Sequence, residues 1–301
     1  MDTQTQRRAR AALIFSMVIF GTIGIFRRHI NLPSGVIAML RGAVGMAFLL
    51  LTGAVRGQKI NLAAVRRNFP VLALSGTVMG FNWILLFEAY RYTSVAVATL
   101  CYYMAPIFVI LASPVLLSER ITRRRLLCVS AALAGMVLVS GILQAGVGGG
   151  QEFFGIALGL GAAALYAAVI LLNKRMEGLS SADRTIVQLG VAAAVLLPYT
   201  LLTGELTLAA FAAMTPLAAV MLMVVCVVHT GLSYALYFGS MNALPAQTVA
   251  LLSYIDPVVA ILLSALLLGE TLSVPAAIGA ALVLGAAVVS EMPSRKGGVS
   301  Q

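Results

Sequence analysis

Long apolar stretches separated by short polar segments run along the whole chain. A helix needs roughly 20 apolar residues to cross about 30 Å of hydrocarbon. Ten stretches approach this length, at residues 9–26, 34–54, 69–90, 94–117, 125–143, 153–173, 182–203, 216–240, 246–268 and 274–291. This pattern predicts an all-α integral membrane protein with ten transmembrane helices. The short loops between most of the spans predict one compact bundle.

The glycine-rich segment 144–151 divides five spans from five. We therefore expect a first repeat at residues 1–143, a linker at 144–152, a second repeat at 153–291 and a cytoplasmic tail at 292–301.

The two halves of the chain repeat each other. Residues 87–122 match residues 238–273 without a gap, at a shift of 151 positions, so that Pro106 pairs with Pro257. An odd number of spans in each copy turns the second copy upside down, which predicts two inverted five-helix repeats. Many secondary transporters use this arrangement and place their site near the bilayer midplane. The matched prolines predict helix kinks at Pro106 and Pro257.

Basic residues are distributed very unevenly between the loops. Sixteen of the 20 Lys and Arg residues fall in segments that share the side of the N-terminus, and only Arg27, Arg28 and Arg91 fall in the opposite loops. The positive-inside rule then places both termini in the cytoplasm of a cell with the chain in its inner or plasma membrane. Because these residues lie in short loops, the net charge of +10 does not indicate nucleic-acid binding.

Composition agrees with a membrane protein and excludes several classes of function. The chain is 61% hydrophobic and only 10% charged, with a mean hydropathy of +1.01, whereas soluble domains carry about 25% charged residues. Three unpaired cysteines and two histidines offer no disulfide, metal site or catalytic cluster, so we expect no enzyme activity, cofactor or metal. No Gly-rich Lys-Ser/Thr loop for ATP is present, which leaves gradient-driven or facilitated movement. The sequence leaves the oligomeric state open.

Four ionisable residues lie inside the apolar stretches, where a charge needs a partner or water. Arg41 and Glu88 share the outer half, and we expect an ion pair that joins spans two and three or an outer-gate contact. His229 and Asp256 fall near the midplane. His229 is interpreted equally as a packing residue or a cavity group. Asp256 precedes a proline and is expected to face a cavity, where it carries a proton or balances a substrate amine; the alternative is that it only fixes span nine.

Aromatic and polar side chains cluster at matched places in the two repeats. Such walls with a few polar handles suit small amphipathic ligands, although ordinary helix packing explains any single ring equally well. The predicted cavity comprises Asn82, Trp83, Tyr102, Tyr103, His229, Ser233, Tyr234, Tyr254 and Asp256.

The segments after spans four and nine have a structural explanation. Thr122 and Ser273 are natural N-caps for the next helix, which would place Glu119 and Glu270 near its positive end.

Several short motifs give the chain a family resemblance. Phe20-Gly21, Leu40-Arg41-Gly42, Leu117-Ser118-Glu119 and Leu268-Gly269-Glu270 resemble the EamA repeat of the drug/metabolite transporter superfamily. The resemblance implies a cavity lined mainly by spans three, four, eight and nine, with parts of one and six. It also implies a transporter of small metabolites, most often an exporter of amino acids or related compounds. Import, export of a cationic drug, and a non-transporting scaffold or sensor are the alternatives. Copy two has Asp256 where copy one has Ala105, so the repeats differ at their centre.

Overall fold

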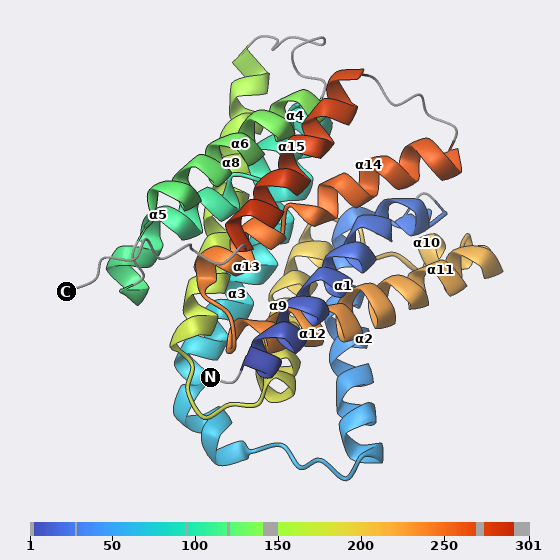
Figure 1. The fold of residues 1–301 in the computed structure, drawn as a ribbon. Coiled ribbons are helices and arrows are strands. Elements are labelled where there is room, and N and C mark those ends of the chain that lie inside the picture. Colours follow the sequence, from blue (N-terminus) through green and yellow to red (C-terminus); the bar gives the residue numbers. More distant parts are fainter. Residues whose placement is uncertain are drawn as a thin grey trace.

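Helices make up nearly all of the computed structural model, which describes residues 3–27, 29–93, 95–118, 121–140, 150–268 and 274–291 (Figure 1). The first half contains α1 (Thr3–Arg27), α2 (Ser34–Val55), α3 (Leu62–Tyr92), α4 (Val95–Tyr102), α5 (Ala105–Leu117) and α6 (Arg123–Ser140). The second half contains α8 (Gly150–Arg175), α9 (Ser181–Leu202), α10 (Leu208–Ala212), α11 (Pro216–Cys226), the π-helix η1 (Val227–Leu232), α12 (Ser233–Met241), α13 (Ala246–Leu252), α14 (Ile255–Leu268) and α15 (Val274–Glu291).

The helices account for the ten predicted spans. Seven helical stretches in the described residues are long and apolar enough to cross a membrane. The helix α6, the pair α13 and α14, and α15 complete the set. The predicted fold, an all-α membrane protein of ten spans in two inverted repeats, is confirmed. The predicted linker at 144–152 lies mostly, and the tail at 292–301 entirely, outside the described residues.

Spans four and nine are each divided at the same place in the repeat. One break separates α4 from α5, and the other separates α13 from α14. Bonds between residues three apart close the two turns, from the Met104 amide to the Cys101 carbonyl (3.1 Å) and from the Tyr254 amide to the Leu251 carbonyl (3.2 Å). Pro106 and Pro257 lie in the first turn of the helix that follows each break. A proline fits there because it has no N–H to donate.

Span eight is interrupted by a feature that the sequence pattern did not predict. The π-helix η1 separates α11 from α12 and contains His229 and Thr230. Two hydroxyls bond back across five residues, Thr230 Oγ1 to the Val225 carbonyl (3.0 Å) and Ser233 Oγ to the Val228 carbonyl (2.9 Å). Such single-turn π segments are frequent at functional sites.

Helices of one half pack mainly against helices of the other. The helix α1 lies against α14 and α12, and its counterpart α8 lies against α5 and α3; α2 pairs with α9, and α6 pairs with α15. Exchanging the two halves converts each of these pairs into another, or into itself, as two inverted copies around one core require. Glycine permits a close approach of α1 to α14: a Cβ on Gly21 would lie 2.7 Å from the Asp256 carbonyl oxygen.

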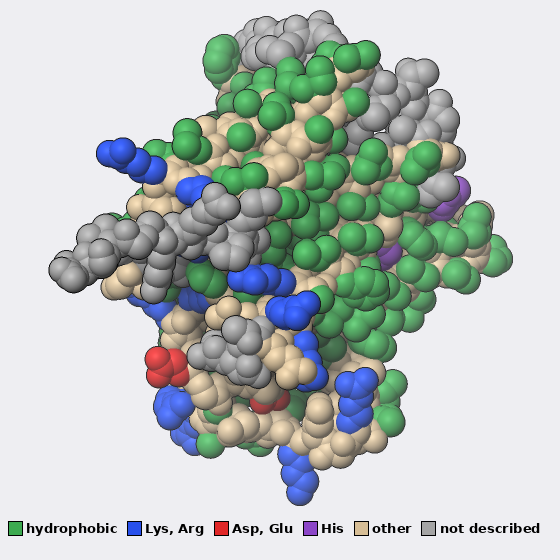
Figure 2. All heavy atoms as spheres, in the orientation of Figure 1, with side chains coloured by type: hydrophobic (Ala, Val, Ile, Leu, Met, Phe, Trp, Pro, Cys, Tyr) green, Lys and Arg blue, Asp and Glu red, His purple; other side chains and the backbone are tan. Residues whose placement is uncertain are grey.

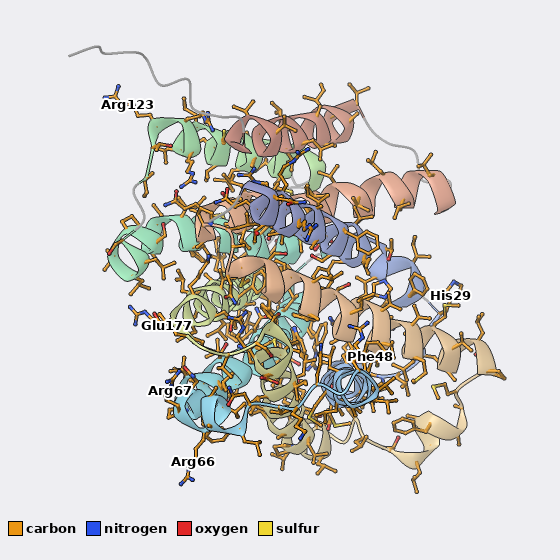
Figure 3. The ribbon with its side chains drawn as sticks, turned by 60° about the horizontal axis from the view of Figure 1, so that its bottom comes forward. His29, Phe48, Arg66, Arg67, Arg123 and Glu177 are labelled. Carbon is orange, nitrogen blue, oxygen red and sulfur yellow. The ribbon has the colours of Figure 1, made fainter. Side chains whose placement is uncertain are left out.

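The outer surface is that of a protein in contact with lipid. Hydrophobic side chains cover much of the visible face in Figure 2, whereas Lys and Arg gather around its lower part. Among the exposed residues are Leu127 (70% exposed) and Leu202 (88%). In Figure 3, Arg66, Arg67 and Arg123 lie at one end of the bundle and His29 at the other. These three of the basic residues expected on one side therefore share one end of the molecule.

The helix-cap interpretation is confirmed where the structure describes it. Thr122 Oγ1 accepts a hydrogen bond from the Arg125 amide (3.3 Å), which caps α6. Ser118 before it takes a left-handed conformation with φ 56°, which ends α5. Glu119, Glu270 and Ser273 lie outside the described residues, so their predicted places at helix termini stay predictions.

Candidate functional site

A cavity of about 160 Å³ lies at the centre of the bundle, where the two broken spans meet α1, α2, α3, α8 and α12. Five of the predicted cavity residues line it: Trp83, Tyr102, Tyr103, Tyr234 and Asp256. Further walls come from Met17, Phe20, Ile23, Arg41, Leu86, Phe87, Ala105, Pro106, Tyr166 and Ser253. Both repeats therefore contribute, and the rings form an aromatic enclosure with few polar groups.

Asp256 is the acidic group of this cavity. It belongs to the first turn of α14, directly after the break in span nine. The Tyr103 hydroxyl, from the repeat-related break, lies close enough to its carboxylate to interact with it. The side chain is half-buried and lines the cavity, while Gly21 fits against its backbone carbonyl from α1. The two broken spans thus meet through this carboxylate.

Arg41 is the basic group of the same cavity. Its Nε donates to Thr230 Oγ1 in η1 (3.0 Å), and its guanidinium carbon lies 5.1 Å from the Trp83 ring centre. Tyr234 packs on the same tryptophan, with ring centres 6.3 Å apart. The π-helix and the single tryptophan therefore hold the guanidinium at the cavity wall through a hydrogen bond and a cation–π contact.

The expected pair of Arg41 with Glu88 is replaced by other contacts. Glu88 forms an ion pair with Arg91 (3.0 Å) and accepts a hydrogen bond from the Tyr199 hydroxyl (2.9 Å). Arg41 instead turns toward Trp83 and Thr230. Residues at a shared depth can face different neighbours, because rotation about the helix axis decides which side chains meet. The sequence thus indicated how deep Arg41 lies in its span, but not the direction in which its side chain points.

Four predicted cavity residues lie behind the lining rather than in it. Asn82 Nδ2 donates to the Ala162 carbonyl (2.6 Å), and the Tyr254 hydroxyl donates to the Tyr103 carbonyl (2.9 Å). Ser233 Oγ donates to the Val228 carbonyl in η1. His229 Nε2 lies 2.7 Å from Thr22 Oγ1, which gives its proton to the Ile19 carbonyl. These contacts fix the helices that carry the lining.

Tyr166 on α8 is a lining residue that sequence reasoning missed. It stacks on Tyr102 with ring centres 5.5 Å apart and on Tyr237 with centres 6.4 Å apart. Its hydroxyl donates to the Tyr237 hydroxyl (2.9 Å). The available signal was an isolated tyrosine in the middle of span six, whose neighbours are small or aliphatic residues.

A ten-span bundle of inverted repeats, with an aromatic central cavity that carries a few polar groups, is typical of membrane transporters. Within that class, the chain belongs to the EamA-like transporter family, which matches residues 8–141 and 153–292. The chain is 29% identical to the uncharacterized transporter YxxF of Bacillus subtilis (strain 168) over 269 residues, 89% of this chain and 85% of the relative. It is also 29% identical to an uncharacterized transporter of Archaeoglobus fulgidus over 288 residues, 94% and 96% of the two chains. A solved crystal structure shares the fold with a TM-score of 0.83 at 19% identity, over 94% of this chain and 97% of that one.

Proposed function

We propose that this transporter moves a small zwitterionic metabolite, an amino acid or a close relative, out of the cell. The observation that supports this substrate class is the presence of Arg41 and Asp256 in the walls of one aromatic cavity. A guanidinium binds a carboxylate through two parallel hydrogen bonds, and a carboxylate binds an ammonium group. The small volume suits a metabolite rather than a drug-sized ligand.

Arg41 is the reason to prefer a zwitterion over a cationic drug. A cavity built for a cation alone would be expected to carry acidic and aromatic groups without a guanidinium. Here the basic group is anchored by Thr230 and Trp83, so it cannot easily withdraw from a bound cation. Export is the direction that we propose, supported by the resemblance to exporters in the EamA repeat.

We further propose that movement alternates access between the two ends of spans four and nine. At one end α13 packs against α5, and Gln247 there binds both the Arg125 guanidinium (2.5 Å) and Ser113 Oγ (2.7 Å). At the other end α4 packs on α8 and α14 on α1, beside the cavity. Rocking about the two breaks would open the end that Gln247 holds together and close the opposite end. Loop charge supports assigning the end with Gln247 to the cytoplasm.

The substrate is tested with purified protein in vesicles. We expect counterflow of a labelled L-amino acid from a mixed panel, and rejection of polyamines and nucleobases. Efflux from cells loaded with dipeptides tests direction. Binding confined to organic cations would refute the zwitterion proposal.

Orientation is tested by tags at Gly148 and at the C-terminus. We expect the two tags on opposite faces of the membrane, because five spans separate them. Both tags on one face would contradict the proposed topology.

A further inference from the structure

The neighbours of Tyr166 determine whether its hydroxyl can donate or accept a hydrogen bond in the cavity. The side chain lines the cavity from α8, between the rings of Tyr102 and Tyr237. A phenol can normally either donate or accept one hydrogen bond toward a ligand, and it adapts to the ligand. Three successive hydrogen bonds remove this freedom here.

Counting the available protons shows which group donates in each of these three hydrogen bonds. Ser253 Oγ donates its single proton to the Val249 carbonyl (2.8 Å). Ser253 can therefore only accept from Tyr237, whose hydroxyl lies 3.4 Å away. Tyr237 has then used its own proton, so Tyr166 must donate to Tyr237, at 2.9 Å. The proton of Tyr166 points out of the cavity, and its oxygen offers only lone pairs to a ligand.

This acceptor belongs to the same cavity as the Asp256 carboxylate. Asp256 follows Ser253 by three residues, at the break where the hydrogen-bond chain ends. The two groups present oxygen acceptors, whereas the Arg41 guanidinium presents only donors. The cavity therefore has an acceptor pole and a donor pole.

We propose that Tyr166 is a specificity-determining residue, whose oxygen requires an N–H donor on the substrate and so selects primary amines over 2-oxo acids. The role rests on the proposed function, because the amine in question is that of the zwitterion. An ammonium group has three donors and satisfies both Asp256 and Tyr166. A 2-oxo group has only acceptors and would leave the Tyr166 oxygen unpaired, which sites of this kind reject strongly.

Two variants, each expected to change the binding of a different probe, test the role of Tyr166. Tyr166→Phe keeps the ring stacking but removes the acceptor, so we expect binding of L-leucine to weaken about tenfold. Tyr237→Phe removes the group that takes the Tyr166 proton. That proton is then free to point into the cavity and to donate to a 2-oxo group.

The probes are L-leucine and 4-methyl-2-oxopentanoate, which share a carbon skeleton and differ in the amine. Titration of purified wild-type and variant protein gives the preference for L-leucine as a ratio of dissociation constants. We expect this ratio to fall about tenfold in both variants, through weaker L-leucine binding in Tyr166→Phe and stronger oxo-acid binding in Tyr237→Phe.

The outcomes separate this role from the proposed function. A wild-type protein that binds L-leucine, with an unchanged ratio in both variants, would overturn the role of Tyr166 alone. An equal weakening of both probes together with a lower melting temperature would show a purely structural hydrogen-bond chain, and would also overturn it. A wild-type protein that binds neither probe, nor any other amino acid, would overturn the proposed function and this role with it.

Discussion

The breaks in spans four and nine have the same backbone design but different chemistry. Each has a tyrosine at the turn and a proline in the next helix, yet copy one has Ala105 where copy two has Asp256. The matched tyrosines also differ: the Tyr103 hydroxyl faces the Asp256 carboxylate, whereas the Tyr254 hydroxyl donates a hydrogen bond to the Tyr103 backbone. The two repeats therefore share the geometry of the break, but only the second has an acidic residue there. A single charge gives the cavity an acidic pole and hence a preferred ligand orientation.

Removing the charge at the second break should have the largest effect. Asp256→Asn preserves size, and the loss of one charge-assisted hydrogen bond, about 1.5–3 kcal/mol, predicts roughly 10- to 100-fold weaker binding of L-leucine. If Asp256 instead couples transport to a proton, pH-gradient-driven transport is lost while exchange between equal pools persists. Vesicle assays in both modes distinguish the two roles. Unchanged transport and pH dependence would reduce the carboxylate to a packing residue.

Arg41, at the donor pole of the cavity, is expected to bind the carboxylate of the ligand rather than its amine. Arg41→Gln is expected to weaken L-leucine about tenfold, since one charged hydrogen-bonding partner of the carboxylate is lost. Binding of 3-methylbutylamine, which lacks the carboxylate, should stay the same in this variant and weaken in Asp256→Asn. Isothermal titration of each ligand into each of the two variants measures the four dissociation constants. Equal weakening of both ligands by Arg41→Gln would contradict two separate poles.

The position of the second break depends on close packing of α1 against α14. In Gly21→Ala the new Cβ would lie 2.7 Å from both the Asp256 carbonyl oxygen and the Val259 Cβ, so one helix must move. Overpacking of this kind costs about 1–3 kcal/mol. We expect a lower melting temperature and weaker ligand binding.

Gly24→Ala on the same helix is the matched control, because a Cβ there meets nothing within 4 Å. It should leave stability and binding unchanged. If the two variants behave alike, contact between α1 and α14 does not position the break.

The smallest expected effect separates the two tyrosines. Tyr103→Phe removes the hydroxyl that faces Asp256, and Tyr254→Phe removes a hydrogen bond to the backbone; each change is expected to cost about 1 kcal/mol. We expect a several-fold change in the apparent affinity for substrate only in Tyr103→Phe, and a small loss of thermal stability in Tyr254→Phe. Transport kinetics and melting curves of both variants measure these effects. A larger change in affinity in Tyr254→Phe than in Tyr103→Phe would contradict this prediction.

Much of this arrangement could be predicted from the sequence, and the limits have physical causes. The span pattern and the repeat predicted a cavity that Asp256 shares with aromatic rings, and Asp256 does line a cavity with Trp83 and Tyr103. The contacts of Arg41 did not, because pairing by depth ignores the direction in which each side chain leaves its helix. His229 was predicted near the midplane, but the π-helix around it has no marker in the hydrophobic pattern. Tyr166 was missed because its role arises from partners on other helices.

The sequence by itself determined the number of spans, the inverted repeats and the single charge that distinguishes them. These properties depend on local composition and on matches along the chain, which the bilayer converts into helices because it leaves no other way to satisfy the backbone. Only the tertiary structure decided that Arg41 and Asp256 share one cavity, and that the Tyr166 proton points away from it. Those features depend on helix rotation and on hydrogen bonds between residues far apart in the chain, such as Tyr166 and Tyr237.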